Sequence, residues 1–255
     1  MSIYRQFWAC LLLSSLLFLT IVFSLKAFPD LGIPDYARAA AIALVGGALL
    51  IAAVKEEGRK VAAIAALLAL LFFSYARTDQ YAPTFVLSLG MASALVYGCA
   101  REKRGFGGTL MKLGIVRQRL VPETLFAIAL TFGIYSLMFF MFLIYKSLGI
   151  ADAQNVIDIV EYLPQRVLLL AVLVNPISEE LFFRGLLAPR IGIVGSAVIF
   201  ALFHLAYGSV MELFNVFIIG VIFAAVYLSR RSLIAPMLSH AIINSTAIIL
   251  MRFGT

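Results

Sequence analysis

The sequence predicts an all-α fold, a polytopic transmembrane helical bundle of about eight or nine spans. Its composition is the first reason: 63% of the 255 residues are apolar and 13% are charged, against about 45–50% and about 25% in a typical soluble domain. The second is the mean hydropathy of +1.04. The third is that the apolar runs are continuous, whereas a membrane β-barrel shows short segments of alternating polarity.

Nine apolar segments follow one another along the chain. Crossing a hydrocarbon core of about 30 Å takes roughly 20 helical residues, so the third and seventh segments are short. No internal repeat or linker separates the segments, and we expect one membrane domain over residues 1–255. The expected spans are 7–25, 36–54, 61–76, 82–100, 125–145, 167–188, 191–207, 211–228 and 232–251.

The net charge of +7 is explained by membrane topology. With nine spans and a cytoplasmic N-terminus, most of the Lys and Arg residues fall in loops on the inner side, which is the bias of membrane proteins. The C-terminus then lies outside, and no nucleic-acid partner is needed to explain the charge. We expect an integral protein of the plasma (inner) membrane. The two cysteines, Cys10 and Cys99, form no CxxC pair, which disfavours a thiolate metal site.

Two connections between spans are long. The basic connection 101–123 mixes apolar and cationic residues over Leu110–Val121, as an interfacial helix on anionic lipid would; substrate docking is the alternative. The connection 146–166 carries acidic residues among Ile and Val and is expected to be an amphipathic stretch on the outer surface. We assign it no chemistry. Tyr207, near the end of a span, is expected to be an interfacial belt residue.

Charged residues inside the spans indicate where function lies, because each costs about 2.5–3.5 kcal/mol at mid-bilayer even on insertion scales. The sixth segment contains Glu179, Glu180 and Arg184. On a helix, Glu180 and Arg184 are four residues apart and can pair on one face. Glu179 is rotated by about 100° from its neighbour and lacks that partner. A free carboxylate in a site of low dielectric constant is a candidate proton acceptor.

The only two histidines of the chain both lie in apolar spans that follow the glutamate pair. His204 ends the sequence FALFH. His240 and Asn244 have the i, i+4 spacing that places an imidazole and a carboxamide on one helical face. By helical rise, Glu179 and these three residues lie roughly 12–20 Å from the inner ends of their spans. They are therefore expected to meet in the inner half or middle of the bilayer.

Three motifs in this order, EExxxR from Glu179, FxxxH from Phe200 and HxxxN from His240, resemble the CPBP (ABI) family of intramembrane proteases. That family contains the CAAX-prenyl endopeptidases of the Rce1 type and bacteriocin-processing or self-immunity proteins. The resemblance covers about 175–244, within the catalytic spans 167–251, and the first 150 residues contain no motif. It implies an intramembrane endopeptidase acting on a membrane-associated protein or peptide, lipidated in the CAAX-processing case.

The resemblance also implies residue roles. Glu179 resembles the general base that, with His204, polarises a water molecule against a peptide carbonyl. His240 and Asn244 resemble donors to the resulting oxyanion.

Three further residues resemble supporting ones. Glu180 with Arg184 resembles an ion pair that holds the catalytic helix, and Phe200 is expected to pack one turn below His204. From the residues alone, the ion pair can equally be structural, and His240 and Asn244 can simply bridge two helices.

A metal site is the alternative chemistry. Glu179, His204 and His240 would supply the His₂Glu ligands of a catalytic zinc ion. The HExxH motif is absent, and the family resembles glutamate-dependent proteases that work without metal, so we expect no cofactor.

Two other classes of function remain as alternatives. A proton- or ion-coupled transporter also uses buried Glu and His side chains, but it predicts duplicated halves with interrupted helices. A non-catalytic immunity or scaffold protein would bind a partner in the membrane. The complete set of motif residues favours the enzyme.

Overall fold

The computed structural model describes residues 87, 91, 94–95, 105–204 and 207–254. The expected spans 7–25, 36–54 and 61–76 lie outside the described residues, as does nearly all of 82–100. Every element in the described part is helical, and no strand occurs there, in agreement with the predicted all-α class. The elements are α5 (Phe106–Lys112), η1 (Arg117–Arg119), α6 (Leu120–Ser147), α7 (Gln154–Tyr162), α8 (Gln165–Leu173), α9 (Asn175–Glu179), η2 (Glu180–Leu187), α10 (Ala188–Leu202), α11 (Val210–Arg230) and α12 (Ile234–Phe253).

Four stretches of the described chain are long and apolar enough to cross a membrane: Phe106–Ser147, Gln165–Leu202, Val210–Arg230 and Ile234–Phe253. Two predicted spans, 125–145 and 211–228, fall within α6 and α11. The predicted span 232–251 begins two residues before α12 and otherwise falls within it. The total of eight or nine spans stays a prediction.

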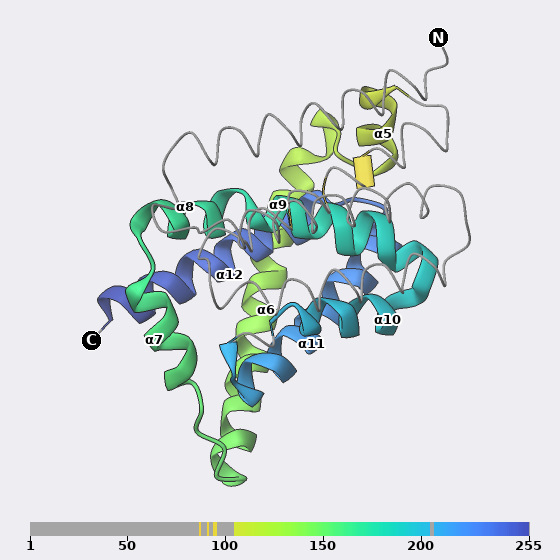
Figure 1. The fold of residues 1–255 in the computed structure, drawn as a ribbon. Helices are drawn as coiled ribbons and strands as arrows, with labels where there is room; N and C mark the ends of the chain where they lie inside the picture. Colours follow the sequence, from red (N-terminus) through yellow and green to blue (C-terminus); the bar gives the residue numbers. More distant parts are fainter. Residues whose placement is uncertain (1–86, 88–90, 92–93, 96–104, 205–206, 255) are drawn as a thin grey trace, which may run out of the picture.

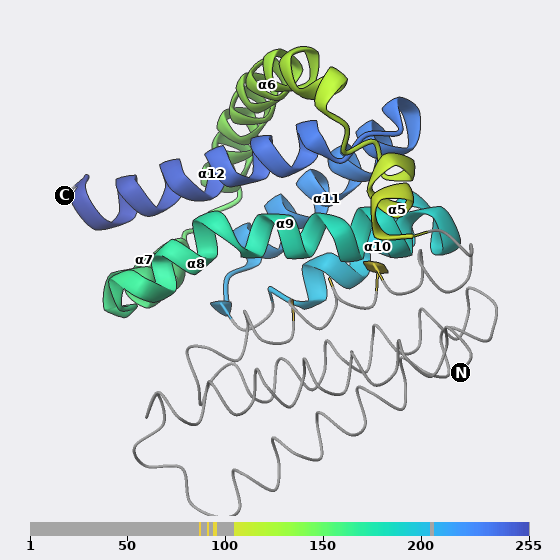
Figure 2. The ribbon, with the colours of Figure 1, turned by 90° about the horizontal axis from the view of Figure 1, so that it is seen from above.

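The stretch Gln165–Leu202 contains two of the predicted spans. Gly192 interrupts α10 with φ 80° and ψ 171°, a conformation that glycine adopts without the penalty a side chain would bring. The chain reverses there, and α10 returns along η2 (Figures 1 and 2). The predicted separation between 167–188 and 191–207 therefore corresponds to a sharp turn.

The Leu110–Val121 stretch is not one interfacial helix. Helix α5 ends at Lys112, and Gly114 follows with φ 72°. At this turn the Leu113 carbonyl accepts a hydrogen bond from Leu233 N at 3.0 Å, and the Gly114 carbonyl accepts one from Ser232 Oγ at 3.3 Å. Two hydrogen bonds thus tie the end of α5 to the connection between α11 and α12.

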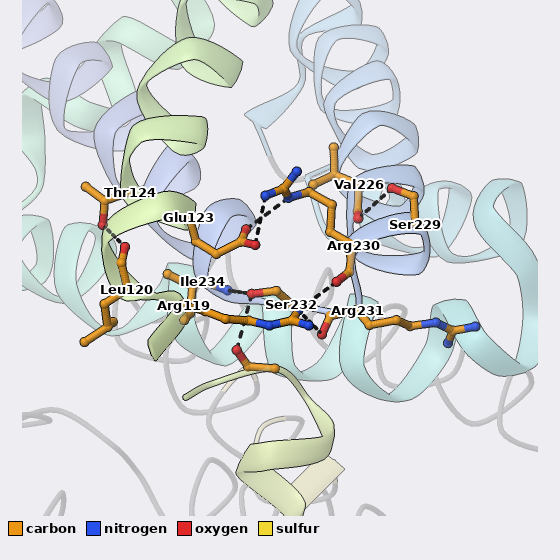
Figure 3. A network of polar contacts seen from close by, with 11 residues as sticks. Arg119, Leu120, Glu123, Thr124, Val226, Ser229, Arg230, Arg231, Ser232 and Ile234 are labelled. Carbon is orange, nitrogen blue, oxygen red and sulfur yellow. Dashed lines mark hydrogen bonds and ion pairs between the residues drawn. The ribbon is translucent and has the colours of Figure 1, made fainter. Parts of the chain in front are cut away.

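A polar network joins the start of α6 to the same connection (Figure 3). Arg230 makes a bidentate hydrogen-bonded ion pair with Glu123, in which Nε lies 3.2 Å from Oε2 and Nη2 lies 3.0 Å from Oε1. Arg119 donates from Nη1 to the carbonyls of Arg230 at 2.9 Å and Arg231 at 3.3 Å. These arginines, all predicted in inner loops, are therefore gathered at one end of the bundle. Which side of the membrane this end faces stays a prediction.

Hydrogen bonds hold both ends of helix α7. At its start, Asp152 accepts hydrogen bonds from Ser209 Oγ at 2.9 Å, from Met211 N at 3.2 Å and from Val210 N. At its end, Arg252 donates to backbone carbonyls that include those of Val160 and Glu161. The predicted amphipathic stretch thus contains a short helix, which is held against the ends of α11 and α12.

Two apolar clusters form the described core. The larger surrounds η2 and α10, where Phe183 and Leu187 are fully buried. The smaller lies under α7, where Val156 and Val160 pack with Leu168. The site described below lies between these two clusters.

The close approach at Gly114 predicts that Gly114→Ala is destabilising. A Cβ there would lie 2.1 Å from the Arg231 carbonyl oxygen, and the left-handed backbone alone costs a non-glycine residue about 1–2 kcal/mol. We expect a lower melting temperature in detergent. Gly107→Ala is the matched control, because nothing lies within 4 Å of its Cβ position. Equal melting temperatures for the two variants would contradict the close packing of Gly114 against the Arg231 carbonyl.

Candidate active site

The two adjacent glutamates lie at the junction between α9 and the π-helical segment η2. Glu179 ends α9 and Glu180 begins η2. In this wider turn the Phe183 carbonyl accepts a hydrogen bond from the backbone N–H of Ala188, five residues later. It also accepts one from Ser196 Oγ of α10 at 2.7 Å. Single π turns within helices occur frequently at functional sites.

The ion pair that the spacing predicts is present. Arg184 Nη1 lies 3.0 Å from Glu180 Oε1, and both side chains are almost completely excluded from solvent. The Arg184 guanidinium carbon also lies 4.2 Å from the ring centre of Phe200, 5.4 Å from that of Phe223 and 5.9 Å from that of Phe183. Ring faces attract a desolvated cation. The arginine is therefore held by one carboxylate and three aromatic rings.

His240 on α12 connects the two glutamates. Its Nδ1 donates to Glu180 Oε1 at 2.9 Å, and its Nε2 lies 3.6 Å from Glu179 Oε2. The second distance is too long for a hydrogen bond. The carboxylate of Glu180 thus fixes the orientation of the imidazole, which presents Nε2 to Glu179. The spacing of the motifs did not predict this contact between His240 and Glu180.

His204 follows α10, one turn after Phe200. Its Nδ1 donates to the Phe200 carbonyl at 3.0 Å, so in the neutral ring Nε2 is left as an acceptor. The Phe200 and His204 rings pack edge to face, with 4.9 Å between their centroids. This is the expected packing of Phe200 one turn below His204. The Tyr207 ring stacks on the His204 ring, with 5.8 Å between their centroids.

Asn244 lies one turn after His240 on α12. Its Nδ2 donates to the carbonyl of Ala171 on α8 at 3.0 Å. Asn244 therefore does bridge two helices, one of the structural roles left open above. A carboxamide nitrogen carries two protons, so the second proton stays available for a substrate oxygen.

One cavity of about 250 Å³ brings the four predicted catalytic residues together. Phe200 also lines it, while Glu180 and Arg184 lie behind its wall. The polar side chains among its described lining are Asn175, Glu179, His204, Tyr207, Glu212, Asn215, His240 and Asn244. The rest are mainly aliphatic residues of α7, α8, α11 and α12.

Sequence reasoning missed several lining residues: Asn175, Tyr207, Glu212 and Asn215. Tyr207 was expected only in the interfacial belt, and Asn175 precedes a proline that begins the glutamate helix. Glu212 lies three residues after Ser209, a spacing typical of a helix cap, so nothing in the sequence singled it out for the cavity.

The residues of the alternative metal set do not cluster as ligands. Among the described residues, no group of three or more His, Cys, Asp or Glu side chains is placed to hold a metal ion. Glu179, His204 and His240 share the cavity without forming such a group. Whether cleavage depends on a metal ion is tested by the chelator experiment described below.

Residues 163–246 match the family model described as type II CAAX prenyl endopeptidase Rce1-like. This range contains all three motifs and most of the cavity lining. This match supports membership of the CPBP family. Neither the comparison with curated proteins nor the comparison with solved structures gives a match.

The match to a protease family, together with helices apolar enough to span a membrane, supports an integral membrane protein. It supports an intramembrane peptidase whose substrate is a peptide or protein in the membrane. The roles of individual residues and the chemistry of the cut are proposals and are argued next.

The burial of the ion pair predicts that Arg184→Ala is strongly destabilising. Removing one partner of a buried pair leaves an uncompensated charge and typically costs about 3–5 kcal/mol. We expect a much lower melting temperature, and partial recovery in the double variant Glu180→Gln/Arg184→Met. A double variant no more stable than Arg184→Ala would contradict this account of the pair.

Proposed function

We propose that this protein is an intramembrane endopeptidase in which a glutamate and a histidine activate water. The observation that carries the proposal is the shared cavity, where Glu179, His204, His240 and Asn244 from three separate segments meet. Buried ionisable groups in membrane spans are costly and are kept for function.

Glu179 is the proposed general base. Its carboxylate lines the cavity at the end of α9, and its Oε2 has no hydrogen-bond partner within the described chain. His204 supports it, because its Nδ1 is occupied by the Phe200 carbonyl and its Nε2 can accept a hydrogen bond from water. The water oxygen attacks the peptide carbonyl carbon while Glu179 takes its proton, and Glu179 then passes that proton to the leaving amine.

Asn244 and His240 are the proposed donors to the oxyanion. Donation from His240 Nε2 requires the imidazolium form, in which both ring nitrogens carry protons. Glu180 holds the Nδ1 side of that ring. Preorganised donors of this kind act strongly in a cavity that excludes water.

Replacement of the base tests the proposal directly. We expect Glu179→Gln to lower the cleavage rate at least about 100-fold, the contribution typical of a general base. The measurement compares protein and peptide termini from cells that carry wild type or Glu179→Gln at matched expression. Glu161→Gln is the control, because Glu161 is exposed on α7 and outside the cavity.

Termini that occur with wild type and Glu161→Gln but not with Glu179→Gln establish proteolysis and identify the substrate. They also show whether that substrate is lipidated and on which side it is cut. Identical termini in all three strains would contradict the proposal and favour a transporter or a non-catalytic binding protein.

The metal-free mechanism makes a separate prediction. Cleavage by purified protein is expected to survive dialysis against EDTA and 1,10-phenanthroline, because water activation is assigned to Glu179 and His204. Loss of activity that added Zn²⁺ restores would overturn this part and assign Glu179, His204 and His240 as ligands.

A further inference from the structure

A second carboxylate lines the cavity, and the proposed reaction does not use it. Glu212 lies in the first turn of α11. Asn215, Val216 and Ile219 follow it at helical spacing, and all four face the same cavity as Glu179 and the two histidines. Val156 and Val160 of α7 line the cavity as well.

Glu212 is not occupied as a helix cap. Ser209 and Glu212 have the spacing of a capping box, in which the glutamate carboxylate would bond back to the serine N–H. The structure contains the first half of this motif, since Glu212 N donates to Ser209 Oγ at 3.1 Å. The reciprocal bond from the Glu212 carboxylate is absent.

Asp152 binds this helix start as well. It accepts hydrogen bonds from Ser209 Oγ and from the backbone N–H groups of Val210 and Met211. Burial works against the charged form of Asp152, but these bonds outweigh it and hold the pKa of the carboxyl below its usual range. An ionised Asp152 thus accepts from the first N–H groups of α11, and the Glu212 side chain lines the cavity.

Among the described residues, the cavity offers Glu212 no cation. No Lys or Arg occurs among its described lining residues, and no hydrogen bond or ion pair joins the Glu212 carboxylate to the described chain. Arg184 lies behind the wall with Glu180 and its aromatic rings. Arg252 is turned to the carbonyls at the end of α7.

We propose that Glu212 binds a positively charged group of the substrate: a Lys or Arg side chain, or a free α-ammonium group, within a few residues of the scissile bond. This inference rests on the peptidase function proposed above. A cation that leaves water for an apolar cavity needs a carboxylate partner, and a charge-assisted hydrogen bond to Glu212 provides one. An acidic residue at the same position would be repelled.

The test uses peptides built on a cleavage sequence found in the comparison of termini. One position is varied among Lys, Gln and Glu, and each peptide is made with a free and an acetylated N-terminus. Wild type is expected to cleave the Lys peptide with the highest kcat/KM. Glu212→Gln is expected to reduce the Lys-over-Gln preference at least about tenfold while still cleaving the Gln peptide.

Two further variants separate recognition from structure. Glu212→Asp keeps the charge and should keep the preference, whereas Glu212→Lys should shift it toward the Glu peptide. Glu161→Gln is the matched control and should behave as wild type. If acetylation rather than the Lys substitution removes the preference, the bound group is the α-ammonium.

The outcomes distinguish the two proposals. Cleavage by wild type with equal kcat/KM for Lys, Gln and Glu peptides, or a preference that survives in Glu212→Gln, would overturn the role of Glu212 alone. Failure of wild type to cleave any of these peptides would count against the peptidase function, and the role of Glu212 would fall with it.

Discussion

The charge of Arg184 inside an apolar bundle is the constraint on which the site depends. A buried guanidinium requires a carboxylate partner, which Glu180 supplies at 3.0 Å. The same carboxylate receives Nδ1 of His240, and the ring that lies closest to the guanidinium belongs to Phe200, whose carbonyl holds His204. The carboxylate that orients His240 is thus itself paired with the buried cation, and the residue that accepts from His204 packs its ring against that cation. Arg184 does not line the cavity, yet it contacts residues that hold both histidines.

The junction of α9 and η2 explains how two neighbouring glutamates take different tasks. Glu180 is fully buried against Arg184, whereas Glu179 faces the cavity. The π turn is stabilised from outside, because Ser196 of α10 donates to the Phe183 carbonyl. The reversal at Gly192 brings α10 back along η2. The turn and the π segment therefore support each other, and together they place His204 in the same cavity as Glu179.

The sequence predicted the helical class from apolar run length and the ion pair from i, i+4 spacing. It predicted that four residues meet from their depths along the spans and from the resemblance of the motifs. It did not predict contacts that depend on how the helices pack. The hydrogen bond from His240 to Glu180 and the aromatic rings around Arg184 come from different segments, and no local pattern relates them. Glu212 was missed for another reason: its local pattern indicates a capping box, but its carboxylate does not bond back to Ser209, and the distant Asp152 binds the start of the helix.

Two carboxylates occur among the described lining residues of the cavity, and their different surroundings support a division between chemistry and recognition. Glu179 has His240 at ion-pair distance, whereas Glu212 has no partner in the described chain. Two negative charges in one cavity of low dielectric constant repel each other, which disfavours holding both ionised. A cationic substrate at Glu212 removes that repulsion at the moment when Glu179 must act as a base. Under this proposal, the group that selects the substrate also prepares the catalytic carboxylate, so substrate charge affects the rate of cleavage as well as binding.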